Sequence, residues 1–174
     1  PSKSTAPTIE EETGYSKKRP FPALLLTSRN LNGPGSGKQV HHVEFDLAGS
    51  GLKYKAGDAL GVVPLNCPEH VADVLAALGS DGEEAVPAPD GSNIPLRRGL
   101  TECYDLGKPS AELLALCNVS GGGGIAVALP HVVDVLIARP GRKLASAPFV
   151  KALKKIQPRL YSISSSPKAH PGQV

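Results

Sequence analysis

The segment of this 174-residue chain with the most chemical potential is RLYSISSS, residues 159–166. If it forms a β-strand, successive side chains point to opposite faces, so Arg159 and Tyr161 share one side. A guanidinium pairs bidentately with phosphate oxygens, and a tyrosine ring stacks on a flat aromatic group. The hydroxyls from Ser162 to Ser166 add neutral hydrogen-bond donors. The pattern therefore fits a ligand that carries both an anion and an aromatic plane.

The same residues also fit a second interpretation without a ligand. In that interpretation Arg159 is a surface charge, Tyr161 is a half-buried ring at a strand end, and the serines form a turn into Pro167. Three consecutive serines do not decide between the two interpretations.

The composition excludes several classes of protein. The chain is 40% hydrophobic and 20% charged, as in ordinary globular proteins. Its net charge of +3 arises from 19 basic and 16 acidic residues without a long run of one sign, so we expect no nucleic-acid partner. No stretch reaches the roughly 20 apolar residues of a membrane span, and the N-terminus has no apolar signal core. We expect a cytoplasmic protein with no membrane partner.

The cysteines and histidines give no metal signature. Cys67, Cys103 and Cys117 are an odd number and form no CxxC pair, and the five histidines are scattered along the chain. We expect buried free thiols and no metal site.

Several strands are expected to position the segment 159–166. The apolar run over residues 21–31 predicts a buried strand, and the alternation over residues 39–49 predicts an antiparallel partner. A turn at Gly57 and Asp58 precedes a short strand over Ala59–Val63. Residues 1–19 are polar and read as a linker or tail.

Helices are expected between these strands and the segment 159–166. Pro68 at a first helical position and apolar residues at helical spacing up to Leu78 predict a helix that Gly79 ends. A hairpin turned at residues 89–91 follows. Four shorter helical candidates are Leu96–Asp105, Ser110–Cys117, His131–Ala138 and Ala147–Ile156. The order predicts a mainly β (α+β) domain over residues 20–174, a barrel with a helical insertion at about 96–156.

Two motifs resemble a known family. RLYSISSS resembles the R-x-Y-S-x-[SA]-S-S segment that holds the flavin in the FAD-binding barrel of the diflavin reductases, a barrel of the ferredoxin–NADP reductase type. LKYKAGDALGVVPLNCPEH, residues 52–70, resembles the Y-x-x-GD-x-x-V-x-P-x-N stretch of the same family. The resemblance covers about residues 15–174 and is nearest to the flavoproteins of NADPH-dependent sulfite reductases.

The resemblance implies an antiparallel Greek-key split barrel that is incomplete at its C-terminus. The segment SGGGG at residues 120–124 stands where the family has helices, which implies a shortened helical connecting region. Arg159 would pair with the FAD pyrophosphate, Tyr161 would stack on the isoalloxazine, and Ser162 would be the catalytic residue near flavin N5. The remaining implied cofactor-binding residues are Leu160, Ser164, Ser165 and Arg29. For Arg29, a contact with NADPH phosphate and a plain surface charge are equally open.

The implied function is the FAD-binding portion of an NADPH-dependent diflavin reductase. Electrons would pass from NADPH through FAD to FMN and on to the haem subunit of a sulfite reductase. The flavodoxin-like FMN domain and the NADPH-binding domain would lie outside these 174 residues, so we expect little turnover from the chain alone. Two alternatives remain: a non-catalytic barrel module with an empty flavin site that serves interaction or spacing, and a plain ferredoxin–NADP reductase, which the helical insertion disfavours.

Overall fold

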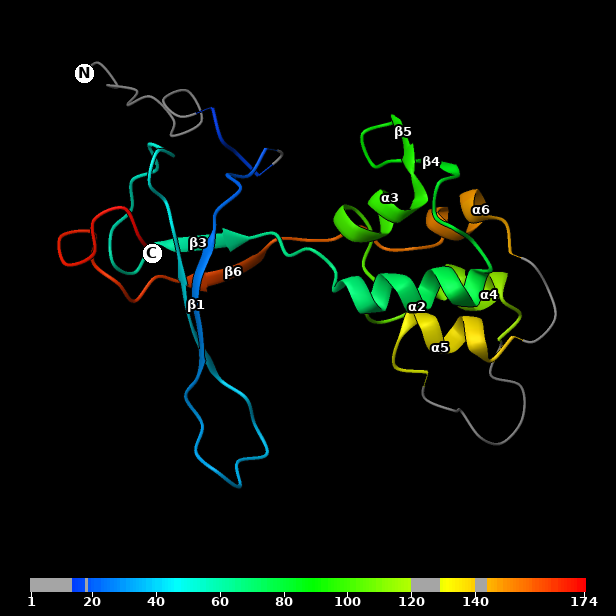
Figure 1. Ribbon diagram of the computed structural model, residues 1–174, viewed down its shortest axis with the longest axis horizontal. Coiled ribbons are helices and arrows are strands. Elements are labelled where there is room, and N and C mark those ends of the chain that lie inside the picture. The colour runs from blue at the N-terminus through cyan, green and yellow to red at the C-terminus, as the bar shows by residue number, and fades with distance from the viewer. Residues whose placement is uncertain (1–13, 18, 120–128, 140–143) are drawn as a thin grey trace, which may run out of the picture. The chain divides into compact units, whose positions relative to one another are not determined.

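The chain divides into two compact units. Unit 1 lies within residues 1–62 and 158–174, and unit 2 spans residues 63–157 (Figure 1). The computed structural model describes residues 14–17, 19–119, 129–139 and 144–174.

The first sheet of unit 1 is the predicted antiparallel pair. Strand β1 (Leu25–Asn30) pairs with β2 (His41–Phe45), with an irregularity in register near the start of β1 (Figure 1). The pairing is confirmed, but the predicted burial of the first strand is wrong. Leu25 and Leu26 are 51% and 41% exposed. Among the described elements β1 makes extensive contacts with β2 alone, so no helix or second sheet covers the faces from which its side chains project.

The second sheet of unit 1 joins segments far apart in the sequence. Strand β3 (Ala59–Val62) pairs antiparallel with β6 (Arg159–Ser162), which confirms both predicted strands. The predicted turn before β3 is also present. Gly57 has φ of +91°, a left-handed conformation that glycine adopts without strain. The Asp58 carboxylate accepts a hydrogen bond from the Lys55 amide at 2.8 Å and so closes the turn.

The C-terminal residues of the chain pair with the region around the end of β2. The amide of Phe45 donates to the carbonyl of Val174 at 2.8 Å, and the amide of Val174 donates back to Phe45 at 3.0 Å. The amide of Leu47 donates to the carbonyl of Gly172 at 2.8 Å. This short ladder gives the β1–β2 sheet a further edge segment.

Unit 2 begins with the helix that the sequence predicts. Helix α2 (Pro68–Leu78) has proline in its first turn and ends at Gly79 with φ of +67°. The amide of Gly79 donates to Ala76, and that of Ser80 donates to Leu75, which satisfies carbonyls at the end of the helix. All of its buried residues lie at helical spacing, and they are Val71, Val74, Leu75 and Leu78.

Among its described residues, unit 2 also contains a small hairpin and four short helices. Strands β4 (Ala85–Pro87) and β5 (Asn93–Pro95) form the predicted hairpin. Helix α2 packs against α3 and α5, and α6 packs against β4 (Figure 1). The four short helices are α3 (Leu96–Glu102), α4 (Ala111–Leu116), α5 (Val132–Ile137) and α6 (Ser146–Lys151).

Two of the predicted helices are too long, for one shared reason. Helix α3 ends at Glu102 and α6 ends at Lys151, whereas the sequence predicts ends at 105 and 156. Within a few residues of these ends the chain leaves the helical conformation, and Tyr104 and Lys155 form an antiparallel bridge. The Asp105 amide donates to the Lys154 carbonyl at 2.8 Å, and the Ile156 amide donates to the Cys103 carbonyl at 2.9 Å. Local sequence does not reveal this long-range pairing.

The hydrophobic core lies in unit 2. Phe149, Leu100 and Val135 are fully buried within it. Its buried apolar residues are Val71, Val74, Leu75, Leu78, Val86, Leu96, Leu100, Tyr104, Leu106, Leu113, Cys117, Val132, Val135, Leu136, Phe149, Val150, Ala152 and Leu153.

The three free thiols differ in burial, which corrects the prediction that all are buried. Cys117 is buried, Cys103 is half-buried and Cys67 is exposed. Cys67 directly precedes α2, where the chain enters the helix at the surface. Burial raises the pKa of the Cys103 thiol.

The observed fold is a mixture of strands and helices, in agreement with the coarse prediction. In the part of the chain that the structure describes, the strands form three separate two-stranded sheets and no closed barrel. No described helix is long and apolar enough to cross a membrane. Two sequence predictions lie wholly or largely outside the described residues: the polar tail over 1–19, and the shortened connection at 120–124.

Candidate functional site

Strand β6 carries the residues that the sequence singles out. Its register with β3 sets Arg159 opposite Val62 and Tyr161 opposite Leu60. Because side chains alternate along a strand, Arg159 and Tyr161 share one face, as predicted. The pairing continues beyond the strand, since the Ile163 amide donates to the Asp58 carbonyl at 2.8 Å. The turn before β3 therefore fixes where the serine-rich segment begins.

All four residues of β6 are exposed. Tyr161 is 53% exposed and Leu160 is 73% exposed, so the phenol ring is accessible to a flat ligand. Within the described residues, no side chain forms an ion pair with the Arg159 guanidinium. A free guanidinium, an accessible ring and neighbouring hydroxyls fit an aromatic ligand that carries phosphate.

The serines between residues 162 and 166 differ in their surroundings. Ser162 and Ser164 are exposed. Ser165 is half-buried, and its hydroxyl lies 3.0 Å from the hydroxyl of Tyr54. The Ser166 carbonyl accepts the amides of the following turn. Ser162 and Ser164 thus retain accessible hydroxyls, whereas Ser165 is engaged by the protein.

Arg29 lies in the other sheet of unit 1. It is exposed on β1 and stands opposite His42 in the β1–β2 register. The structure therefore gathers Arg159, the other β6 residues and the two following serines on one segment, and it leaves Arg29 on a different sheet.

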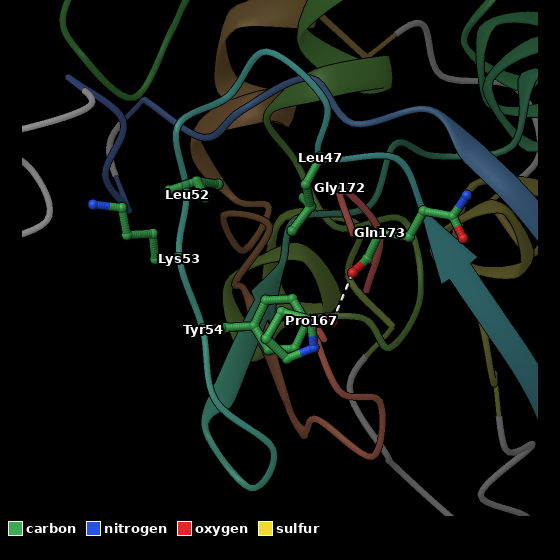
Figure 2. Close-up of a pocket in the computed structure, with 7 residues that line it drawn as sticks. All are labelled: Leu47, Leu52, Lys53, Tyr54, Pro167, Gly172 and Gln173. Carbon is green, nitrogen blue, oxygen red and sulfur yellow. Dashed lines mark hydrogen bonds between the residues drawn. The ribbon is translucent and has the colours of Figure 1, made fainter. Parts of the chain in front are cut away.

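The pocket of unit 1 lies beside the serine-rich segment. It has a volume of about 290 Å³, and Figure 2 shows Tyr54 and Gln173 among its lining residues. Its lining includes neither Arg159 nor Tyr161. The predicted site on β6 is therefore an open strand surface, not a part of this cavity.

A histidine and a carboxylate are hydrogen-bonded on the β1–β2 sheet. His42 Nε2 is 2.7 Å from Glu44 Oε1, and the Thr27 hydroxyl donates to Glu44 Oε2 at 3.1 Å. These hydrogen bonds, that of His42 first, hold the pKa of Glu44 below its usual value. In the described ranges, no group of three or more His, Cys, Asp or Glu residues is arranged to hold a metal ion.

Sequence reasoning missed Tyr54 and Gln173 as partners of the serine segment. The Tyr54 hydroxyl donates to the Gln173 carbonyl at 2.7 Å and also contacts Ser165. Tyr54 is the tyrosine of the second motif, so a signal was present. The contact itself joins residues 111 positions apart and depends on the fold.

Comparisons with known proteins agree with the second motif, residues 52–70, which lies inside the matched region of a family model. Residues 14–90 match the family described as FAD binding domain. The chain is similar to curated proteins named sulfite reductase [NADPH] flavoprotein alpha-component. The relative from Aliivibrio fischeri is 39% identical over 165 residues, covering 87% of this chain and 27% of the relative. The relative from Bacillus subtilis is 36% identical, covering 99% of this chain and 32% of the relative.

The chain is related to the flavoprotein alpha-components of NADPH-dependent sulfite reductases. The resemblance inferred from the two motifs is thereby confirmed. FAD is the cofactor of the matched domain family, as predicted. The chain spans about a quarter to a third of the length of the relatives named above.

Proposed function

We propose that the chain is the FAD-binding portion of an NADPH-dependent diflavin reductase. In the complete system, electrons pass from NADPH through FAD and FMN to the haem subunit of a sulfite reductase. The observation that carries the proposal is the exposed strand β6, on which Arg159 and Tyr161 share one face and are both accessible. The FAD binding domain match supports the choice of ligand.

Each residue of the proposed site has a distinct task. The Arg159 guanidinium binds the pyrophosphate through charge-assisted hydrogen bonds. The Tyr161 ring stacks on the isoalloxazine and Leu160 lies beside it on the strand. Ser162, with its exposed hydroxyl, is the residue that we assign to the reacting edge of the flavin. Bound FAD supplies the ability to accept an electron pair and to release single electrons.

We further propose the domain organisation that the sequence predicts. Residues 1–19 are a linker, and residues 20–174 form part of a Greek-key split barrel with a helical insertion at about 96–156. The flavodoxin-like FMN domain and the NADPH-binding domain are the partners of this portion, in the cytoplasm. Arg29 contributes a positive charge toward NADPH. These assignments follow the family resemblance.

The alternative is a non-catalytic module whose flavin site stays empty. The observation in its favour is that β6 is an open surface and that the pocket of unit 1 does not include Arg159 or Tyr161. Titration of the purified chain with FAD separates the two functions. The flavoprotein hypothesis predicts saturable binding, a shifted visible absorbance of the flavin and weaker binding of riboflavin, which lacks the phosphates.

Variants assign the binding to β6. Loss of a charge-assisted interaction in Arg159→Ala is expected to weaken FAD binding by about ten- to a hundredfold. Tyr161→Ala removes the ring and is expected to cost about three- to tenfold, whereas Tyr161→Phe keeps the ring and stays close to wild type. Arg98→Ala is the matched control, because it removes an exposed arginine from unit 2. Equal effects of Arg159→Ala and Arg98→Ala would contradict the assignment.

A further inference from the structure

The hydroxyl of Tyr54 links its own segment of unit 1 to two others, the serine-rich turn and the C-terminal segment. Its phenol oxygen lies 3.0 Å from Ser165 Oγ and 2.7 Å from the carbonyl oxygen of Gln173. Figure 2 shows the Tyr54 side chain in the pocket of unit 1, with the hydrogen bond to Gln173 as a dashed line. Pro167, which follows the serines, lines the same pocket. Tyr54 thus reaches both the serine-rich turn and the C-terminal segment.

The direction of the two hydrogen bonds follows from the number of protons. A phenol carries one proton, and a backbone carbonyl can only accept. Tyr54 must therefore donate its proton to Gln173. The remaining contact then requires the Ser165 hydroxyl to donate to the Tyr54 oxygen. The single proton of Ser165 is committed to the protein and is not available to a ligand.

The backbone of the C-terminal segment fixes the far end of this connection. Hydrogen bonds from Phe45 to Val174 and from Leu47 to Gly172 flank Gln173 on both sides. The Gln173 carbonyl, which lies between these two bonds, accepts the hydrogen bond from Tyr54. Because the ladder holds this carbonyl, the hydroxyl of Tyr54 is held as well, and so is the oxygen that Ser165 contacts.

We propose that Tyr54 is a positioning residue of the flavin site. It holds the Ser165 hydroxyl away from the ligand and fixes the turn after β6, so that Ser162 and Ser164 are the serine donors to the flavin. This inference rests on the proposed function, because it concerns the same site. The inference restricts the serines that donate to the flavin to Ser162 and Ser164. It also assigns to Tyr54 a role that Tyr54 performs through Ser165.

The first experiment tests the connection without a ligand. Amide hydrogen exchange is measured on the whole chain for wild type, Tyr54→Phe and Tyr104→Phe. The control is matched, because the Tyr104 hydroxyl also donates to a backbone carbonyl, that of Pro87, but in unit 2. Tyr54→Phe is expected to accelerate exchange over residues 163–174 by about two- to tenfold, the effect of one lost hydrogen bond, and Tyr104→Phe is expected to leave it unchanged. Unchanged exchange in Tyr54→Phe would overturn the proposal.

The second experiment measures FAD affinity for Tyr54→Phe, Ser165→Ala and the double variant. Each single change is expected to weaken binding by about two- to tenfold, and the double variant no more than the larger single effect. Ser165→Thr keeps the hydroxyl and is expected to bind like wild type when Tyr54 is present. In the Tyr54→Phe background, Ser165→Thr is expected to bind FAD no more tightly than Ser165→Ala does.

The outcomes separate this inference from the proposed function. If Ser165→Ala weakens FAD binding as much in the Tyr54→Phe background as in wild type, Ser165 contacts the flavin directly and the inference is wrong while the function stands. If wild type does not bind FAD, the proposed function fails, and the positioning role at a flavin site fails with it.

Discussion

Unit 1 and unit 2 differ in how they use their apolar residues. Nearly all the buried apolar side chains of the described residues belong to unit 2, and Ile163 is the exception in unit 1. Most of the large apolar side chains that are exposed belong to unit 1, whereas Leu65 and Ile137 belong to unit 2. The exposed set in unit 1 is Leu24, Leu25, Leu26, Leu31, Val40, Val43, Leu160 and Tyr161.

The difference indicates two sources of stability. Unit 2 gains its stability from apolar burial, which contributes in proportion to the area removed from water. Unit 1 depends on strand pairing and on single hydrogen bonds such as those of Tyr54 and of the Asp58 turn. The candidate site lies in unit 1, so its residues stand on hydrogen-bonded strands whose faces are open. Binding a ligand there would cover surface that the described chain leaves exposed.

The largest expected effect is a cavity in unit 2. Phe149 is fully buried, and Phe149→Ala is expected to lower the free energy of unfolding by about 3–5 kcal/mol. Leu24→Ala in unit 1 removes a side chain that is 66% exposed, and it is expected to cost less than about 0.5 kcal/mol. Urea unfolding followed by the loss of amide protection in each unit measures both, because the described helices all belong to unit 2 and report on that unit alone. Similar losses in the two variants would contradict the contrast between the units.

A smaller effect is expected from a half-buried side-chain amide in unit 2. Asn66 Nδ2 donates to the carbonyls of Leu100 and Tyr104, each at 2.6 Å. Asn66→Ala leaves both without this partner and is expected to cost about 1–3 kcal/mol. Asn32 is the matched residue of unit 1, where its side-chain oxygen accepts the amide of Val40 in the exposed hairpin. Water can replace that bond, so Asn32→Ala is expected to cost less than Asn66→Ala in the same urea measurement, and the reverse order would contradict the account.

The termini of α2 and the positions of the short strands could be predicted from the sequence, because their signals are local. Pro68 and Gly79 delimit α2, and the segment that begins at Arg159 is a strand, as expected. The ends of α3 and α6 could not be predicted, because the residues beyond them leave the helix to pair with each other. The contact between Tyr54 and Ser165 was missed for the same reason. The two motifs identify the segments that carry Tyr54 and Ser165. The direction of the hydrogen bond between them depends on the position of the Gln173 carbonyl, which the motifs do not give.

The smallest expected effect is a pH dependence in unit 2. The Glu84 carboxylate accepts hydrogen bonds from Ser146 at 2.6 Å and from Ser80 at 2.7 Å, which lowers the pKa of Glu84 to about 2 from 4.5. Because the folded-state pKa is lowered, the stabilisation is present above pH 4.5 and is lost as the pH falls toward 2. Glu84→Gln is therefore expected to be less stable than wild type at pH 7, with a gap that closes between pH 4.5 and 2.

Chemical denaturation at several pH values measures this gap. Ser146→Ala removes the first of the two serine donors, so it is expected to raise the pKa of Glu84 toward its usual value and to shift the closing of the gap to higher pH. A gap between wild type and Glu84→Gln that stays constant down to pH 2 would refute the role assigned to these hydrogen bonds.

The most direct test of the central claim is amide hydrogen exchange with and without FAD. At an FAD concentration ten times the dissociation constant, binding to β6 is expected to slow amide exchange within residues 159–166 by about tenfold. The effect is expected at the amides that exchange only when the binding site opens. The helices of unit 2 are expected to keep their exchange rates. Bound FAD that leaves residues 159–166 unprotected, or that protects unit 2 instead, would show that β6 is not the flavin site.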